Sequence, residues 1–377
     1  MIKELSSSAF DAKIIQMIRS DFVEVNTSKF WSEKVKSLEP YVPGEQPKDK
    51  KYIKLNTNEN PYPPSPRVIK AIIDSANEGL RLYPDPECTE LCQEIARYYN
   101  LNEKQVFPGN GSDEILAFAF MAFFNPGNPI VFPDITYSFY PVYCDLYNID
   151  YELNPLDDEF NIQVDGFLRP NGGIVFPNPN APTGKALPLS DIIKILDYNK
   201  ESVVIIDEAY VDFGGETTAC MIDRYPNLLV IQTFSKSRSL AGLRLGFALG
   251  DERLIDALNI VKNSFNSYTI DRLAIKAGME AIKDDDWFQS SRQKIIATRE
   301  RITSALRALG FKVLDSKANF IFISHESYRA GDLFTILKNK GVLVRYFNKP
   351  RIDNYLRVSI GTDDEMDRFL EILKEVI

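Results

Sequence analysis

The amino-acid sequence predicts an α/β fold in which a central, mainly parallel sheet has helices on both faces. Runs such as Val203–Ile206 are apolar at every position, which is typical of strands buried on both sides. These runs alternate with helical stretches through residues 51–295, as in a series of β–α units. The chain has 377 residues, of which 44% are hydrophobic and 26% charged, and this is the composition of a folded globular protein.

The chain is expected to have three parts. Residues 1–50 are polar and interrupted by prolines, which indicates an N-terminal arm. In the large domain, residues 51–295, strands are expected at Pro129–Phe132, Gly173–Phe176, Ser202–Asp207, Leu228–Thr233 and Leu245–Leu249, and helices at Asp113–Phe124, Leu189–Asn199 and Arg253–Asn263. Residues 296–377 indicate a smaller α+β domain, with a long helix that ends at Gly310, strands at Phe320–Ile323, Leu343–Tyr346 and Tyr355–Ser359, and a terminal helix.

Charge and residue counts argue against several classes of protein. A net charge of −9 provides no basic surface for nucleic acid or anionic lipid. No apolar run approaches the roughly 18 residues that span a bilayer, and the first residues lack the apolar core of a signal peptide, so a cytoplasmic location is expected. Cys88 and Cys92 lack partners at zinc-site spacing and are expected on one face of a helix.

The single histidine, His325, argues against a Ser-His-Asp hydrolase and against a metal site built from several histidines. Proton transfer is therefore expected from a lysine, a tyrosine or a carboxylate.

A lysine directly after a buried strand is the first candidate functional residue. In the segment Thr233–Arg238, hydroxyl groups flank the amine of Lys236, among them that of Ser235, and Arg244 follows. Such a segment offers a nucleophilic amine together with donors for a phosphate dianion. The alternative is a solvated loop with ordinary surface charges.

An aspartate at the end of a neighbouring apolar run is the second candidate. Asp207 follows Ser202–Ile206, where an ionised carboxylate is costly unless it has a partner. A protonated pyridine nitrogen is such a partner, and the phenol of the nearby Tyr210 could donate to a ring oxygen. The alternative is that Asp207 caps the turn that follows.

Two loops could bind an anion or a ring. Gly109–Glu114, which includes Ser112 and Asp113, precedes an apolar helix and lets backbone N–H groups converge at its N-terminus. It lacks the glycine spacing of a Walker loop, so an ATP site is not expected. Pro177–Gly184, which includes Asn180, follows an apolar run and can form a rigid turn with amides available to a ring, although proline rigidity alone would also explain it.

Two arginines near the C-terminus could bind an anionic substrate. Arg357 lies in one expected strand, and Arg345 lies at the end of another. Arginines on neighbouring strands can form a fork for a carboxylate or a phosphate. The alternative is that both are exposed on an edge strand.

Taken in order, these segments resemble the signature of class I/II aminotransferases of fold type I, which depend on pyridoxal 5′-phosphate (PLP). The resemblance covers nearly the whole chain after residue 50 and rests on Gly109–Glu114, Tyr137, Asn180–Gly184, Asp207 with Tyr210, Ser235–Lys236, Arg244 and Arg357. Within the class the chain most resembles histidinol-phosphate aminotransferases, in the stretches Leu55–Tyr62, Tyr83–Pro86, Asp207–Phe213, Leu240–Arg244 and Leu343–Phe347. The resemblance implies a large PLP-binding domain, a smaller C-terminal domain, and a homodimer with shared active sites.

The resemblance also implies a role for each matching position. Lys236 would bind PLP covalently and carry a proton, Asp207 would pair with the pyridine nitrogen, and Tyr210 would donate to the ring oxygen O3′. Tyr137 would stack on the ring. The cofactor phosphate would be held by Ser112, Asp113, Ser235, Arg244 and the partner subunit's Tyr83, and the anionic groups of the substrate by Arg345 and Arg357.

The implied reaction is transamination between histidinol phosphate and 2-oxoglutarate in histidine biosynthesis. An aromatic amino-acid or prephenate aminotransferase is an alternative, because the anion-binding arginines could serve either ligand. A threonine-phosphate decarboxylase is another, because it uses the same cofactor residues but removes CO2. A PLP-binding regulator would need a DNA-binding segment, for which the N-terminal arm is a poor candidate. One departure from the family pattern is Ala181, where many relatives carry Asn, and Asn180 would then supply the O3′ contact. The first 25 or so residues extend beyond the usual start of the family, and the sequence assigns no function to them.

Overall fold

The computed structural model describes residues 29–377. By internal contacts the chain divides into two units, residues 1–41 and 42–377. In the first unit the described residues form helix α2 (Glu33–Ser37), and the Ser32 side chain caps its N-terminus. The second unit contains all the other helices and strands that the structure describes. The boundaries expected at residues 50 and 295 stay predictions.

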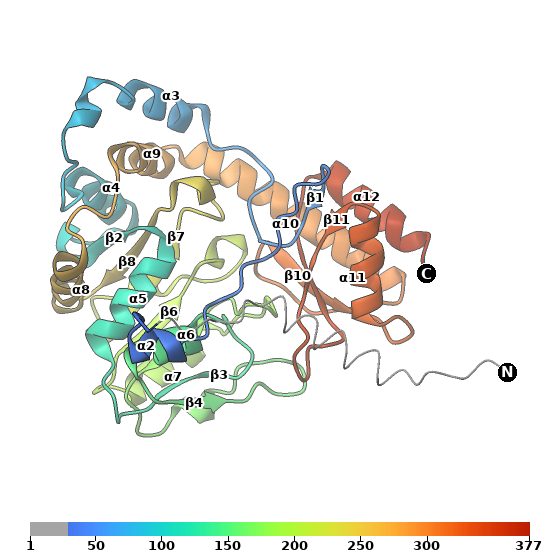
Figure 1. Cartoon of the computed structure of the whole chain (residues 1–377), viewed down its shortest axis with the longest axis horizontal. Helices are drawn as coiled ribbons and strands as arrows, with labels where there is room; N and C mark the ends of the chain where they lie inside the picture. The colour runs from blue at the N-terminus through green and yellow to red at the C-terminus, as the bar shows by residue number, and fades with distance from the viewer. Residues whose placement is uncertain (1–28) are drawn as a thin grey trace. The chain divides into compact units, whose positions relative to one another are not determined.

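A seven-stranded sheet lies at the centre of the second unit (Figure 1). Its strands are, in spatial order, β2 (Val106–Gly109), β8 (Gly246–Gly250), β7 (Leu228–Thr233), β6 (Val204–Asp207), β5 (Ile174–Pro177), β3 (Ile130–Pro133) and β4 (Tyr151–Asn154). Strand β8 runs antiparallel to both of its neighbours, and the other pairs are parallel. This mainly parallel sheet confirms the predicted α/β class.

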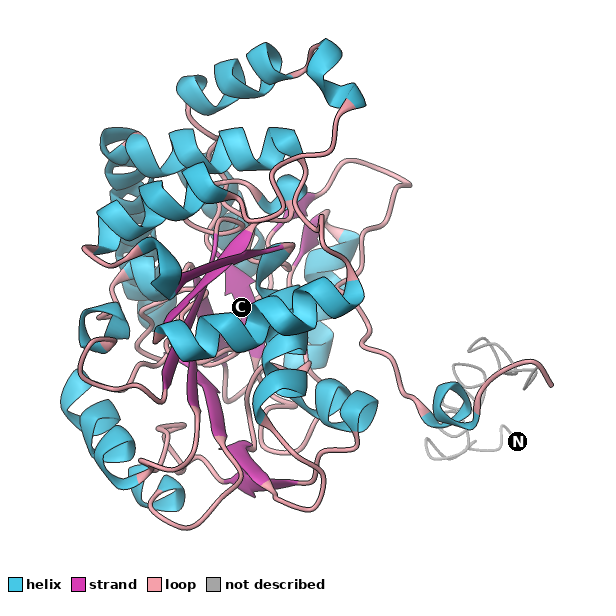
Figure 2. Cartoon of the chain, turned by 90° about the vertical axis from the view of Figure 1, so that its left-hand side faces the viewer, coloured by secondary structure: helices cyan, strands magenta, loops and turns pink. Residues whose placement is uncertain are grey.

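Both faces of the sheet are buried. In β6, the side chains of Val204 and Ile206 enter one hydrophobic core and Ile205 enters another. Figure 2 shows these strands in magenta with helices on either side. The two cores explain why Val204, Ile205 and Ile206 of β6 are all apolar. The helices of this region are α3 (Pro66–Ser75), α4 (Thr89–Tyr99), α5 (Gly111–Phe123), α6 (Tyr140–Tyr147), α7 (Leu189–Tyr198), α8 (Glu252–Phe265) and α9 (Arg272–Lys283).

The C-terminal residues build a third core around a four-stranded antiparallel sheet. Its strands are, in spatial order, β12 (Arg345–Tyr346), β13 (Leu356–Ser359), β10 (Phe320–Ser324) and β9 (Lys312–Val313). The helices are α10 (Asp285–Ala308), α11 (Ala330–Asn339) and α12 (Asp363–Lys374), and a separate parallel pair joins β1 (Ile53–Lys54) to β11 (Val342–Leu343). The pair β1–β11 attaches the segment that precedes the large sheet to the C-terminal core.

Short 3-10 helices occupy several connections. They are η1 (Glu78–Arg81), η2 (Glu103–Gln105), η3 (Val164–Phe167), η4 (Val211–Phe213), η5 (Thr218–Met221) and η6 (Ala241–Leu243). Cys88 and Cys92 are both buried, at the N-cap and within the first turns of α4. None of the helices in the described part of the chain is long and apolar enough to cross a membrane.

The strands and helices expected in the large domain are confirmed to within two residues at each end. The expected strand Leu343–Tyr346 is instead divided between β11 and β12, because residues on either side of Val344 pair with different strands. Strands β2 and β4, which lie at the two edges of the large sheet, were not expected.

Candidate active site

The candidate residues of the large sheet follow the carboxyl ends of neighbouring strands. Asp207 is the last residue of β6, and Ser235 and Lys236 follow the end of β7, which pairs with β6 in parallel. The turn that contains Asn180 follows β5, the other neighbour of β6. Functional groups of an open α/β sheet are expected at this edge, and the topology brings these residues to it.

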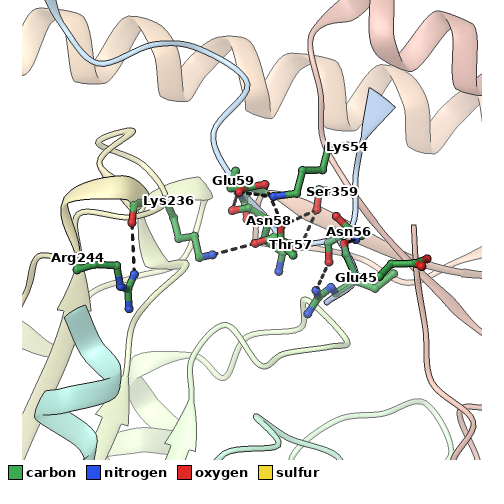
Figure 3. A network of polar contacts seen from close by, with 12 residues as sticks. Glu45, Lys54, Asn56, Thr57, Asn58, Glu59, Lys236, Arg244 and Ser359 are labelled. Atoms are coloured by element: carbon green, nitrogen blue, oxygen red, sulfur yellow. Dashed lines mark hydrogen bonds and ion pairs between the residues drawn. The ribbon is translucent and has the colours of Figure 1, made fainter. Parts of the chain in front are cut away.

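Lys236 has a partly buried side chain, and its amine lies in an unusual environment (Figure 3). Its Nζ donates to the Thr57 carbonyl at 3.1 Å and lies 5.9 Å from the centre of the Tyr210 ring. Burial, and then the nearby charge of Arg357, lower the pKa of Lys236 from 10.5 to about 8. The Asn60 side chain donates to the Lys236 carbonyl at 3.0 Å, which holds the main chain behind the amine.

Asp207 is a buried carboxylate, 4% exposed, that faces the same region. The Tyr140 hydroxyl donates to its Oδ2 at 3.1 Å, and the Ala209 N–H donates to its Oδ1 at 3.2 Å. Burial raises the pKa of Asp207 to about 6, although both hydrogen bonds and the charge of Lys236 oppose the rise. The carboxylate therefore lacks a full counter-charge within the described chain and is suited to a cationic partner.

Tyr210 lies between these residues and the C-terminal core. Its hydroxyl accepts a hydrogen bond from the Asn58 side chain at 3.1 Å, and its ring meets Phe320 edge to face with the centroids 5.0 Å apart. Burial raises the pKa of Tyr210, so the phenol keeps its proton and can donate it to a ligand.

A cluster of donors forms where helix α5 begins. Arg244 Nη2 lies 3.1 Å from Asp113 Oδ2, and its Nη1 lies 3.5 Å from Ser235 Oγ. The Tyr137 hydroxyl donates to the other oxygen of Asp113 at 2.7 Å. Asp113 was expected to contribute its backbone N–H group, and the structure shows that its side chain also orients Arg244 and Tyr137.

This cluster fits a phosphate dianion. The side chain of the N-cap residue Asn110 donates to the Thr269 carbonyl at 3.1 Å and accepts no hydrogen bond from the described first-turn N–H groups of the 13-residue helix α5, whose aligned peptide dipoles favour negative charge at this end. A Cβ at Gly111 would lie 2.6 Å from Arg244 Nη2, so the absence of a side chain there lets the guanidinium approach the helix end. Amine, carboxylate, phenol and anion cradle are thus present together, as PLP requires.

The two arginines expected to bind substrate are direct neighbours. Arg345 of β12 and Arg357 of β13 are register partners in the antiparallel pair. Their guanidinium carbons lie 5.6 and 5.7 Å from the centre of the Phe347 ring. Like charges placed directly opposite each other are unfavourable, so this pair favours an anionic ligand.

The segment Asn56–Asn60, called the strap below, joins the two halves of the site (Figure 3). The Asn58 N–H donates to Ser359 Oγ at 2.9 Å, and the Ser359 hydroxyl donates back to Asn58 Oδ1 at 2.8 Å. Arg357 donates to the Asn56 carbonyl at 2.8 Å. The strap therefore contacts Lys236 through Thr57 and Asn60, and Arg357 through Asn56.

Two expected residues are placed differently from the rest. The Asn180 side chain is fully buried and donates to the Ile135 carbonyl at 3.0 Å and to Thr183 Oγ1 at 3.1 Å, and its Oδ1 has no hydrogen-bond partner within residues 29–377. Its contact with the ring oxygen stays a prediction. Tyr83 is 79% exposed and stacks on Tyr268 with the centroids 4.6 Å apart.

Sequence reasoning assigned no role to Tyr140, Asn58 or Asn60. The asparagines lie in the stretch Leu55–Tyr62 that carries the resemblance, and its density of amide side chains was the available signal. Tyr140 offered only its position one helical turn after Tyr137. His325 lies away from this chemistry, since its ring meets Phe311 and Tyr328 edge to face.

Comparisons with known proteins identify the family of the chain. A histidinol-phosphate aminotransferase of Clostridium acetobutylicum is 62% identical over 350 residues, which are 93% of this chain and 99% of the relative. The solved histidinol-phosphate aminotransferase of Sinorhizobium meliloti, in complex with PLP, has a TM-score of 0.82 at 22% identity and covers 93% of this chain and 99% of its own. An L-threonine-O-3-phosphate decarboxylase of Porphyromonas gingivalis has a TM-score of 0.73 at 19% identity, covering 86% and 99%, so these two structures indicate the fold alone. Residues 50–373 match the family described as aminotransferase class I and II, and the chain belongs to that family.

Proposed function

We propose that this chain uses PLP, bound through Lys236, to transfer the amino group of histidinol phosphate to 2-oxoglutarate in histidine biosynthesis. The observation that carries the proposal is the Lys236 amine, with a pKa lowered to about 8, just after the end of β7, while the buried carboxylate of Asp207 ends the neighbouring parallel strand β6. The 62% identity to a histidinol-phosphate aminotransferase over 93% of the chain supports the choice of amino donor. A cytoplasmic location is part of the proposal.

The pyridine nitrogen, the ring oxygen, the ring face and the phosphate of the cofactor each have a proposed partner in the site. Asp207 would face the pyridine nitrogen, Tyr210 and Asn180 would face the ring oxygen, and Tyr137 would stack on the ring. The phosphate would be held by the backbone N–H groups of Ser112 and Asp113 and by the side chains of Ser235 and Arg244. When bound, PLP supplies an electron sink for the pair of electrons left when the substrate Cα loses its proton.

The Lys236 amine would carry that proton. A base works best when its pKa lies near the working pH, and burial moves the pKa of this amine from 10.5 to about 8. The Thr57 carbonyl, 3.1 Å from Nζ, provides a position for the amine when the substrate has displaced it. Asp207 would keep the pyridine nitrogen protonated, because its own burial is compensated only when a cation faces it.

The pair Arg345 and Arg357 would bind the anionic end of each substrate in turn. Guanidinium groups bind phosphate and carboxylate through the same planar pattern of donors. One pair can therefore hold the phosphate of the donor and a carboxylate of the acceptor, which never occupy the site together in ping-pong kinetics.

The test of this proposal is a panel of amino donors with 2-oxoglutarate as acceptor. Histidinol phosphate should give the highest kcat/KM, compared with phenylalanine, tyrosine and threonine phosphate. A preference for an aromatic amino acid would support the second candidate, an aromatic or prephenate aminotransferase. Release of CO2 from threonine phosphate would instead support a decarboxylase.

A homodimer with shared active sites completes the proposal. Tyr83 is 79% exposed and its neighbour Leu82 is 54% exposed, and exposed apolar side chains that form a patch can mark a protein–protein interface. A second copy of the chain would cover it and receive the Tyr83 hydroxyl at its cofactor phosphate.

Mixed dimers test this arrangement. The variants Lys236→Ala and Tyr83→Ala should each have little activity alone, but a dimer of the two contains one site with both native residues. Activity should therefore return when the two are co-expressed. If a mixed dimer of proven composition shows no recovery of activity, that result contradicts a shared site.

A further inference from the structure

The loop between β12 and β13 lies beside both substrate arginines. It begins with Phe347, whose ring centre lies 5.6 Å from the guanidinium carbon of Arg345 and 5.7 Å from that of Arg357. The aromatic ring thus supports two like charges that would otherwise repel each other. Any movement of Phe347 changes the surface on which both arginines lie.

Arg351, in the same loop, ties it to the large sheet. Its Nη1 donates to Asp134 Oδ2 at 2.8 Å, and its Nη2 donates to the carbonyls of Leu156 and Asp157, each at 2.8 Å. These acceptors lie just after β3 and β4, whereas Phe347 and Arg351 belong to the C-terminal region. Three charge-assisted hydrogen bonds on one guanidinium make a specific link between the two regions.

The backbone of Arg351 is also in an unfavourable conformation. Its φ angle is 68°, in the left-handed region that side chains other than glycine rarely adopt. Such a residue persists where surrounding contacts hold it, and it often occurs close to a functional site. Here the guanidinium bonds to Asp134, Leu156 and Asp157 supply those contacts.

The link closes one side of a cavity of about 240 Å³. Loop residues Phe347, Arg351 and Ile352 line one wall, and Ile135, Thr136 and Pro182 line another. The cavity shares Phe347 with the arginine pair, and the Ile135 carbonyl accepts the hydrogen bond from Asn180. It therefore lies between the proposed substrate site and the Arg351 link.

We propose that Arg351 is a positioning residue for substrate binding: it fixes the loop that carries Phe347 and thereby the placement of Arg345 and Arg357. The inference rests on the proposed function, because it assumes that these two arginines bind the anionic end of the substrate. In this proposal Arg351 acts through the loop and Phe347, and it does not act by direct contact with substrate or cofactor.

The experiment compares Arg351→Met with the unchanged holoenzyme. Methionine keeps much of the side-chain length but has no donor, so the link is lost. We expect KM for histidinol phosphate to rise about tenfold or more, as for loss of a bond to a charged group, with kcat within about twofold. The dissociation constant of inorganic phosphate from the holoenzyme, whose cofactor already fills its own phosphate site, should rise in parallel. Arg351→Lys, which keeps one charge-assisted bond, should recover part of the affinity.

A matched control lies beside the same loop. Arg329 is an exposed arginine 3.9 Å from Asp353 of the loop, and Arg329→Met should leave KM, kcat and phosphate binding unchanged. If Arg351→Met does not fold, Asp134→Asn removes the charged partner and keeps the Oδ1 acceptor for the Leu156 N–H, 2.9 Å away. A rise in KM smaller than that expected for Arg351→Met should then be seen.

Arg357→Met separates failure of this inference from failure of the proposed function. If Arg357→Met leaves KM and phosphate binding unchanged, the proposed anion site is wrong. If Arg357→Met weakens both but Arg351→Met, or Asp134→Asn in its place, does not, the positioning role of Arg351 is overturned alone. A loss of kcat or of thermal stability with KM unchanged would also overturn it, because that result indicates a purely structural role.

Discussion

Replacing Asp207 by Asn should stabilise the cofactor-free protein but lower the kcat of the PLP-bound enzyme. Burial raises the pKa of Asp207 from 3.8 to about 6. Between pH 3.8 and about pH 6 the Asp207 carboxyl group is ionised in the unfolded chain but still mostly protonated in the folded protein. The free energy of unfolding therefore falls as the pH rises through this range. Above pH 6 the loss is complete, and at 1.36 kcal/mol for each pKa unit it amounts to about 3 kcal/mol. The Asp207→Asn protein would not carry this cost.

The hydrogen bonds of Asp207 can survive the change. An amide oxygen can accept from the Ala209 N–H, now 3.2 Å from Oδ1, and the Tyr140 hydroxyl can rotate to accept from the new amide. The expected gain is therefore at most about 3 kcal/mol at pH 8, and roughly half of that remains at pH 5. In the loaded enzyme the same change removes the counter-charge of the pyridine nitrogen and should lower kcat about 100-fold or more.

Urea unfolding of the cofactor-free protein at pH 5 and pH 8 measures the first effect, and single-turnover kinetics with histidinol phosphate measure the second. Asp74→Asn is the matched control, because Asp74 forms an exposed ion pair with Lys70 and should show neither effect. An Asp207→Asn protein that is less stable than the unchanged protein at pH 8, or a stability difference that is the same at both pH values, would refute the burial argument.

Three other substitutions test single contacts. Lys236→Ala should abolish the covalent link that borohydride traps, and a gain in mass equal to the reduced cofactor would count against Lys236. Glu59→Gln should lower the pH midpoint for capture of PLP by the cofactor-free protein below about 8, because the Glu59 carboxylate favours the charged amine of Lys236. An unchanged midpoint would mean that this carboxylate has no influence on the pKa of Lys236. Tyr210→Phe leaves the Asn58 amide, 3.1 Å away, without its acceptor and should cost about 1 kcal/mol of stability in thermal unfolding; no loss would show that water replaces the phenol.

The parts of the fold that sequence could predict are those where local pattern and burial agree. β6 and β7 are buried on both faces, so nearly every position is apolar and the strands are evident. β4 lies at the edge of the sheet with Tyr151, Glu152 and Leu153 exposed, and β2 contains Pro108, so neither has the pattern of a buried strand. Whether such a segment forms a strand depends on the strands with which it pairs, and those strands lie elsewhere in the chain.

The same distinction applies to the site. Lys236, Asp207 and Arg244 occur in short segments whose residue types indicate chemistry by themselves. The contact between Asn58 and Tyr210, and that between Tyr140 and Asp207, depend on how distant segments meet. The neighbouring positions of Arg345 and Arg357 could be proposed from sequence, but only the strand register establishes them as direct partners.

The hydrogen bonds between the strap and β13 have a consequence for synthesis of the protein. Asn58 and Ser359 are 301 positions apart in the chain, and so are Asn56 and Arg357. While a ribosome is still translating, the amine of Lys236 can emerge with the large sheet, but the carbonyl groups of the strap have no C-terminal strand to hold them. A nascent chain therefore cannot form these contacts of the strap until β13 (Leu356–Ser359) has been translated, and termination of synthesis before β13 leaves the strap without them.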